Sequence, residues 1–131
     1  MTDYFDEIFD SVRAHILQQH PEAHVYSDYP QKPGEFPTIT IDAENRIPRW
    51  GGGSNEVISE TMTVTVTVET AGLGKKRLAR ELIQTAERWL LSHNFRRTAD
   101  YERNELYQSA VHKQMIRYVV EIGKNGQLYR A

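Results

Sequence analysis

The stretch "ETMTVTVTVET", residues 60–70, alternates apolar and hydroxyl-bearing side chains with the period of a β-strand. Its apolar side chains therefore share one face, and its threonines share the other. The apolar positions are Met62, Val64, Val66 and Val68. The hydroxyl positions are Thr61, Thr63, Thr65 and Thr67. The apolar face must be covered by another layer of the fold. The threonine face is predicted to contact water or to form an interface with another subunit.

The same alternation extends outward from this stretch and predicts one long strand over residues 57–70. A second strand is predicted at "TITIDA", where Ile39 and Ile41 point opposite to Thr38 and Thr40. Between the two lies "ENRIPRWGGGSNE", residues 44–56, whose three consecutive glycines favour a mobile loop. Together these segments predict a long antiparallel hairpin that projects from the domain.

Two helices are predicted over residues 3–19 and 75–93, because their apolar residues recur at three-and-four spacing. The first helix should end before Pro21. Residues 95–101 and 113–123 are predicted as the third and fourth strands, whereas residues 102–112 are ambiguous. Residues 25–27 and 128–130 are each compatible with a further short strand, and Asn125-Gly126 favours a tight turn between strands.

The expected architecture is a single α+β domain over residues 1–131, in the order α-β-β-α-β-β. Two helices are expected to pack on one face of a mostly antiparallel four-stranded sheet.

Composition and charge limit the classes of function. The chain has 131 residues and a net charge of −2. It contains no cysteine, so disulfides, thiol nucleophiles and cysteine-based zinc sites are excluded. Residues 1–44 hold nine acidic and two basic residues, whereas the rest hold fourteen basic and nine acidic ones. Such a split is compatible with ordinary surface variation or with two complementary patches on one subunit. The apolar runs are too short to span a bilayer, and an acidic, amphipathic start argues against export.

The motifs that could indicate an enzyme do not fit their templates. "HPEAH", residues 20–24, has Pro21 where a zinc protease needs its glutamate. "AGLGKKR", residues 71–77, lacks the first glycine and the hydroxyl residue of a phosphate-binding loop. We therefore predict no catalytic, cofactor-binding or metal-binding residues, although a site assembled only in three dimensions would leave no such motif.

The sequence also predicts residues that contact other proteins. Arg46, Arg49 and Trp50 lie in the hairpin loop, and arginine and tryptophan are enriched in protein contacts. Trp50 could equally fold back on its own sheet. A basic contact surface is also predicted, formed by Lys75, Lys76, Arg77, Arg96 and Arg97. The basic C-terminal strands, with interleaved tyrosines, leave a nucleic-acid-binding domain as an alternative, although acidic residues interrupt them.

Several segments together resemble the small neck proteins of long-tailed bacteriophages. These are "FPTITI" after a proline-rich loop, "VETAGLGKK" after the long strand, "LARELIQTAERWLLSHNFRRT", and the closing "IRYVVEIGKNGQLYR". The chain thus resembles the tail terminator, tail completion, head–tail joining and minor capsid proteins. It departs from that pattern at Asn94, where a glycine is usual, and in its triple-glycine loop.

The resemblance implies a virion structural protein without catalysis, made in the cytoplasm of a bacterial host from a phage or prophage gene. It implies a homo-oligomeric ring, commonly a hexamer and sometimes monomeric in isolation, that ends the tail tube and joins it to the head connector. The tail tube protein and the head connector protein are therefore the expected partners, with no membrane, cofactor or small-molecule substrate. A head-closure or minor capsid role in the neck is the alternative within this class.

Overall fold

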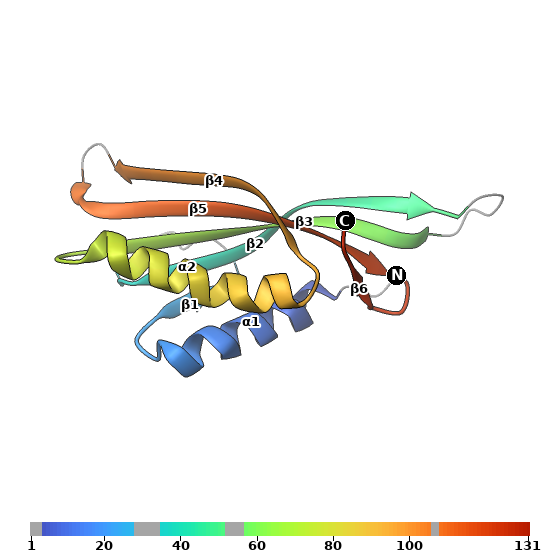
Figure 1. The fold of residues 1–131 in the computed structure, drawn as a ribbon, viewed down its shortest axis with the longest axis horizontal. Coiled ribbons are helices and arrows are strands. Elements are labelled where there is room, and N and C mark those ends of the chain that lie inside the picture. Colours follow the sequence, from blue (N-terminus) through green and yellow to red (C-terminus); the bar gives the residue numbers. More distant parts are fainter. Residues whose placement is uncertain (1–3, 28–34, 52–56, 106–107) are drawn as a thin grey trace.

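The structure is a computed structural model that describes residues 4–27, 35–51, 57–105 and 108–131. In chain order its elements are α1 (Phe5–Gln19), β1 (His24–Tyr26), β2 (Thr38–Trp50), β3 (Val57–Ala71), α2 (Lys75–Ser92), β4 (Arg96–Glu105), β5 (Gln108–Gly123) and β6 (Leu128–Tyr129). Both helices lie on the same side of the sheet and run antiparallel to each other (Figure 1).

The predicted four-stranded, mostly antiparallel sheet is wrong. The described strands form a six-stranded mixed sheet in the order β1-β2-β3-β5-β4, with β6 added beside β5. β1 pairs parallel to β2, and the other pairs are antiparallel. The sheet curls into a half-barrel. The two extra strands have three and two residues, so they are defined by their pairing rather than by any alternation in sequence.

The long strand β3 has 15 residues because it is paired along both sides. Its partner β2 pairs with it from Thr38 opposite Glu69 to Trp50 opposite Val57, with two register shifts along the way. On its other side, β5 pairs from Ser59 to Ala71. β3 is therefore the central strand, and its backbone groups are satisfied on both edges.

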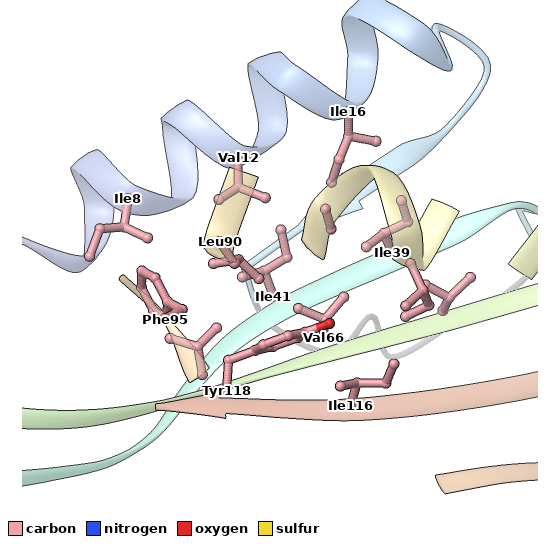
Figure 2. Close-up of a cluster of buried hydrophobic side chains, with 14 of the residues drawn as sticks. Ile8, Val12, Ile16, Ile39, Ile41, Val66, Leu90, Phe95, Ile116 and Tyr118 are labelled. Atoms are coloured by element: carbon pink, nitrogen blue, oxygen red, sulfur yellow. The ribbon is translucent and has the colours of Figure 1, made fainter. Parts of the chain in front are cut away.

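The core lies between this sheet and the two helices. On β3, the apolar residues of the opening stretch are at most 1% exposed. Figure 2 shows Ile8, Val12 and Ile16 of α1 directed toward Leu90 and the sheet. The three-and-four spacing of α1 thus places its buried face on the apolar face of the strands, as hydrophobic burial requires.

Within the segment predicted as a mobile loop, residues 44–56, the structure shows residues 44–50 as strand. β2 continues to Trp50, with a register shift between Ala43 and Asn45 that interrupts the alternation. Pro48 is compatible with this strand because the described part of β1 pairs only with residues 38–40, which leaves that side of β2 unpaired further along. Residues 52–56, including two of the three glycines, lie outside the described residues, as do 106–107 of the ambiguous segment.

The threonine face is less open than the alternation implied. Thr65 and Thr67 are only 4% and 5% exposed, whereas Thr61 and Thr63 are half-buried. The curled sheet therefore leaves Thr65 and Thr67 almost no surface to offer a neighbouring subunit. Within the predicted strand face, only Thr61 and Thr63 retain accessible area in the single chain.

Replacing Thr65 with valine should raise the free energy of unfolding by about 1–2 kcal/mol, because the hydroxyl oxygen of Thr65 is buried without a hydrogen-bond partner in the described structure. Valine keeps the branched shape and removes the unpaired polar atom. The matched control is Thr67→Val on the same face. The hydroxyl oxygen of Thr67 is not among the buried, unpaired polar atoms of the described residues, so no gain in stability is expected. Urea unfolding followed by circular dichroism measures both, and a loss of stability in Thr65→Val would contradict the prediction.

Candidate interaction surface at the hairpin end

Several large side chains are exposed at the end of the sheet where β2 ends and β3 begins. Ile47, Trp50, Ile58 and Tyr129 are 64%, 58%, 44% and 43% exposed. The side chain of Arg49, among them, is 69% exposed. We call these five residues the hairpin-end surface. Figure 1 shows this end of the β2–β3 hairpin extending beyond both helices, so the helical layer does not cover it.

The five residues come from three strands, β2, β3 and β6. Ile47 lies opposite Thr61, Thr61 opposite Glu121, and Glu121 opposite Tyr129. In the next row, Arg49 lies opposite Ser59. Ile47, Arg49 and Tyr129 thus share the face of the sheet turned away from the helices, whereas Ile58 has the strand parity of Met62 and Trp50 follows a register shift.

The orientation of Arg49 is set by a neighbouring carboxylate. Arg49 Nη1 donates to Glu121 Oε1 at 3.2 Å, and Ser59 Oγ donates to the same oxygen at 2.8 Å. The hydrogen bond from Ser59, and then that from Arg49, lower the pKa of Glu121 below its ordinary value, although burial opposes them. Because the folded pKa is the lower one, the contact contributes stability above the unfolded pKa, and this is lost as pH falls through the folded value.

A shallow groove of about 500 Å³ runs beside this pair. Arg49, Ile58, Lys124 and Tyr129 are among the residues that line it. The ring of Tyr129 rests on Gly123, because a Cβ added at position 123 would lie 2.9 Å from Tyr129 Cε2. The groove therefore combines apolar side chains with two exposed cations and with the polar groups of Ser59, Glu121 and Asn125.

The turn that borders the groove is fastened to α1. Gly126 has a φ of 84°, and the amide of Gln127 donates to Asn125 Oδ1 at 3.0 Å, so the predicted Asn125-Gly126 turn is confirmed. The ring of Tyr4 lies directly against Gly126, where an added Cβ would come within 2.7 Å of it. The start of the first helix thus holds the groove's edge in place.

The structure separates the predicted loop residues. Arg49 and Trp50 belong to the hairpin-end surface. Arg46 instead lies opposite Met62 on the helix side of the sheet, where its guanidinium sits 5.7 Å from the centre of the Phe5 ring. Arg46 Nε also approaches Glu60 Oε1 at 3.7 Å. Sequence reasoning missed Ile58 and Tyr129 of this surface, and it missed Glu121, which orients Arg49.

The predicted basic surface is divided between two places. Lys75, Lys76 and Arg77 lie in the first turn of α2, whereas Arg96 and Arg97 begin β4. The two β4 arginines are already engaged: Arg96 Nε donates to the carbonyl of Ala131 at 3.2 Å, and Arg97 forms a bidentate pair with Glu87.

The histidines of "HPEAH" do not converge. His20 Nε2 contacts Thr85 Oγ1 at 3.3 Å, while His24 Nδ1 lies 3.2 Å from Glu35. Within residues 4–27, 35–51, 57–105 and 108–131, no three metal-binding side chains cluster. Neither described helix has the length and apolar character needed to cross a membrane.

Comparison with known proteins does not assign the chain to a family. No protein-family model matches the chain, and no curated protein matches it.

Proposed function

We propose that the protein is a virion assembly protein of a long-tailed phage or prophage, located in the neck, that ends the tail tube and joins it to the head connector. It acts by burying surface against other proteins and has no catalytic turnover. The resemblance of several sequence segments to neck proteins supports the proposal, and so does the character of the hairpin-end surface.

The observation that carries the proposal is the exposure of four large apolar or aromatic side chains, Trp50, Ile47, Ile58 and Tyr129, on the strands at the end of the sheet that extends beyond the helices. Monomeric proteins rarely expose large apolar side chains together unless the patch has a partner. Tryptophan, tyrosine and arginine are also the residue types that dominate binding energy in protein interfaces. A hairpin end with this composition is suited to contact the end of a tail tube.

The binding mode follows from the same residues. The apolar side chains would supply the buried centre of the contact, while Arg49, oriented by Glu121, would give it direction and charge selectivity. Arg97 and Arg117 are each paired with a carboxylate, Glu87 and Glu44 respectively. These pairings make the basic strands less suited to nucleic acid, because their charges are already partly neutralised.

The test is deletion of the gene from the phage or prophage that encodes it, followed by electron microscopy of the particles. We expect separate heads and tails, with tails of uncontrolled length, and recovery of normal particles when the wild-type gene is supplied in trans. Tails of uniform length that fail only to attach would favour head closure and contradict tail termination. Normal particles would reject the virion role altogether.

A further inference from the structure

We propose that Pro48 prevents the outer edge of β2 from pairing with β-strands of other protein molecules. The hairpin end then contacts its partners through side chains rather than by strand addition. This inference goes beyond the proposed virion role and does not depend on it, because strand pairing is a property of the purified chain.

The strand β2 has one open edge. β3 pairs with β2 from Thr38 to Trp50, whereas β1, on the other side of β2, pairs only with residues 38–40. No other described strand lies on that side. Residues 41–50 therefore leave an open edge about 33 Å long, at about 3.3 Å per residue. An edge of this kind presents a row of N–H and C=O groups that can accept a strand from another chain.

The register shows which backbone groups face this edge. The amide of Lys124 on one side donates to the carbonyl of Ile58 at 3.1 Å, so the backbone of Ile58 faces β5. Backbone groups alternate in direction along a strand, so the backbone of Glu60 also faces β5 and points away from β2. Pro48 lies opposite Glu60, and opposite residues of an antiparallel pair face each other or both face away. The backbone of Pro48 therefore faces the open edge.

A proline at this position acts on the open edge alone. By the same alternation, the N–H of Arg46 faces the open edge, whereas those of Ile47 and Arg49 face β3. Proline has no N–H to donate, so the ladder between β2 and β3 loses nothing, and only an incoming strand would lack a bond. Edge positions of this kind are where sheets tolerate proline.

Side-chain charge protects this edge less well than the proline does. Arg46 and Arg49 are exposed on β2, and charged side chains can discourage strand pairing. However, Arg46 Nε lies 3.7 Å from Glu60 Oε1, and Arg49 Nη1 lies 3.2 Å from Glu121 Oε1. Each pairing reduces the repulsion that two copies of the strand would feel.

The hairpin end also needs such protection. Ile47 and Trp50 are 64% and 58% exposed on this strand, and exposed apolar side chains favour association of an open edge. Figure 1 shows that neither helix covers this end of the sheet. The register shift between Ala43 and Asn45 interrupts the edge only at its other part. Pro48 is therefore the feature that blocks strand addition beside the exposed side chains.

Amide hydrogen exchange of the wild type, followed by nuclear magnetic resonance, tests the direction of the backbone groups. The amide of Arg46 should exchange at least tenfold faster than the amide of Ile47, because only the second is bonded to β3. If the two amides exchange equally slowly, the edge is already covered and the proposal is overturned.

Replacing Pro48 with threonine tests the blocking role. Threonine supplies the missing N–H and suits a strand, so the variant should stay folded. We expect its self-association constant, measured by sedimentation velocity, to rise at least tenfold over that of the wild type. In the associated form the amide of Arg46 should become protected from exchange.

The matched control carries Arg46→Pro together with Pro48→Thr. This chain moves the missing donor two residues along the same edge, so it should associate no more strongly than the wild type. Circular dichroism should show that both variants are folded. The proposal is overturned if Pro48→Thr associates like the wild type, or if both variants associate equally strongly. Either result leaves the microscopy of tails unaffected, so the two proposals fail separately.

Discussion

Replacing Ile41 with alanine should lower the free energy of unfolding by about 2–5 kcal/mol. Ile41 is fully buried on β2, opposite Val66, which in turn lies opposite Ile116 on β5. Figure 2 shows all three side chains within the cluster between the sheet and the helices. The substitution would remove packing from the centre of a three-strand row, and close-packed neighbours can only partly fill the space.

The same change six residues further along this strand provides the matched control. Ile47 is 64% exposed, so Ile47→Ala should alter stability by no more than about 0.5 kcal/mol. Urea unfolding at constant buffer, followed by circular dichroism, measures both variants. Small domains are stable by about 5–15 kcal/mol, so the Ile41 loss would be a large fraction of the total. If both variants lost the same free energy of unfolding, Ile41 would not be buried and Ile47 exposed as the structure shows, and the prediction would be contradicted.

The contrast between Ile41 and Ile47 shows how far alternation can be read from sequence. Ile39 and Ile41 alternate cleanly with threonines, so their strand was predictable. Past Ala43 the register shifts, Pro48 interrupts the pattern, and glycines follow. Those features are typical of a loop, yet pairing with β3 extends the strand to Trp50. Pairing with β3 decided the outcome, from Asn45 opposite Thr63 to Trp50 opposite Val57, and the alternation within this segment does not reveal that pairing.

The same limit explains the error in the sheet. A strand of two or three residues, such as β6 or β1, contains too few positions to show a period. Likewise, residues 102–112 lack alternation, but residues 102–105 belong to β4 and residues 108–112 to β5, and the extent of these strands is set by the pairing between them. Propensity and pattern therefore identified the two helices and the central strand, whereas strand number and direction required the tertiary contacts.

The candidate site was predictable only in part for a related reason. Arg49 and Trp50 are conspicuous by residue type, so composition alone singled them out. Arg46 is three positions from Arg49, and an odd spacing on a strand puts two side chains on opposite faces. Because residues 44–56 were predicted as a loop, this rule was not applied, and Arg46 was grouped with Arg49 and Trp50. Tyr129 carries no local signal and joins the surface through strand register, and Glu121, which orients Arg49, is likewise placed by register.

Replacing Trp50 with alanine should weaken binding to the tail tube protein by at least about 2 kcal/mol, roughly a 30-fold rise in Kd. Trp50 presents the largest side chain of the hairpin-end surface and is 58% exposed, so it can lose substantial water-accessible area on docking. For the same reason its removal should leave the fold intact. The unfolding midpoint of Trp50→Ala should stay close to that of the wild type.

The control for Trp50 is Leu91→Ala. Leu91 is also apolar and 50% exposed, but it lies on α2 rather than at the hairpin end, so binding should not change. Isothermal titration against the purified tail tube protein, or against tails lacking the native protein, measures all three chains. A general effect of surface hydrophobicity would weaken both variants alike. Unchanged binding in Trp50→Ala would remove the hairpin end from the contact, since a central aromatic anchor should account for much of the energy of such an interface.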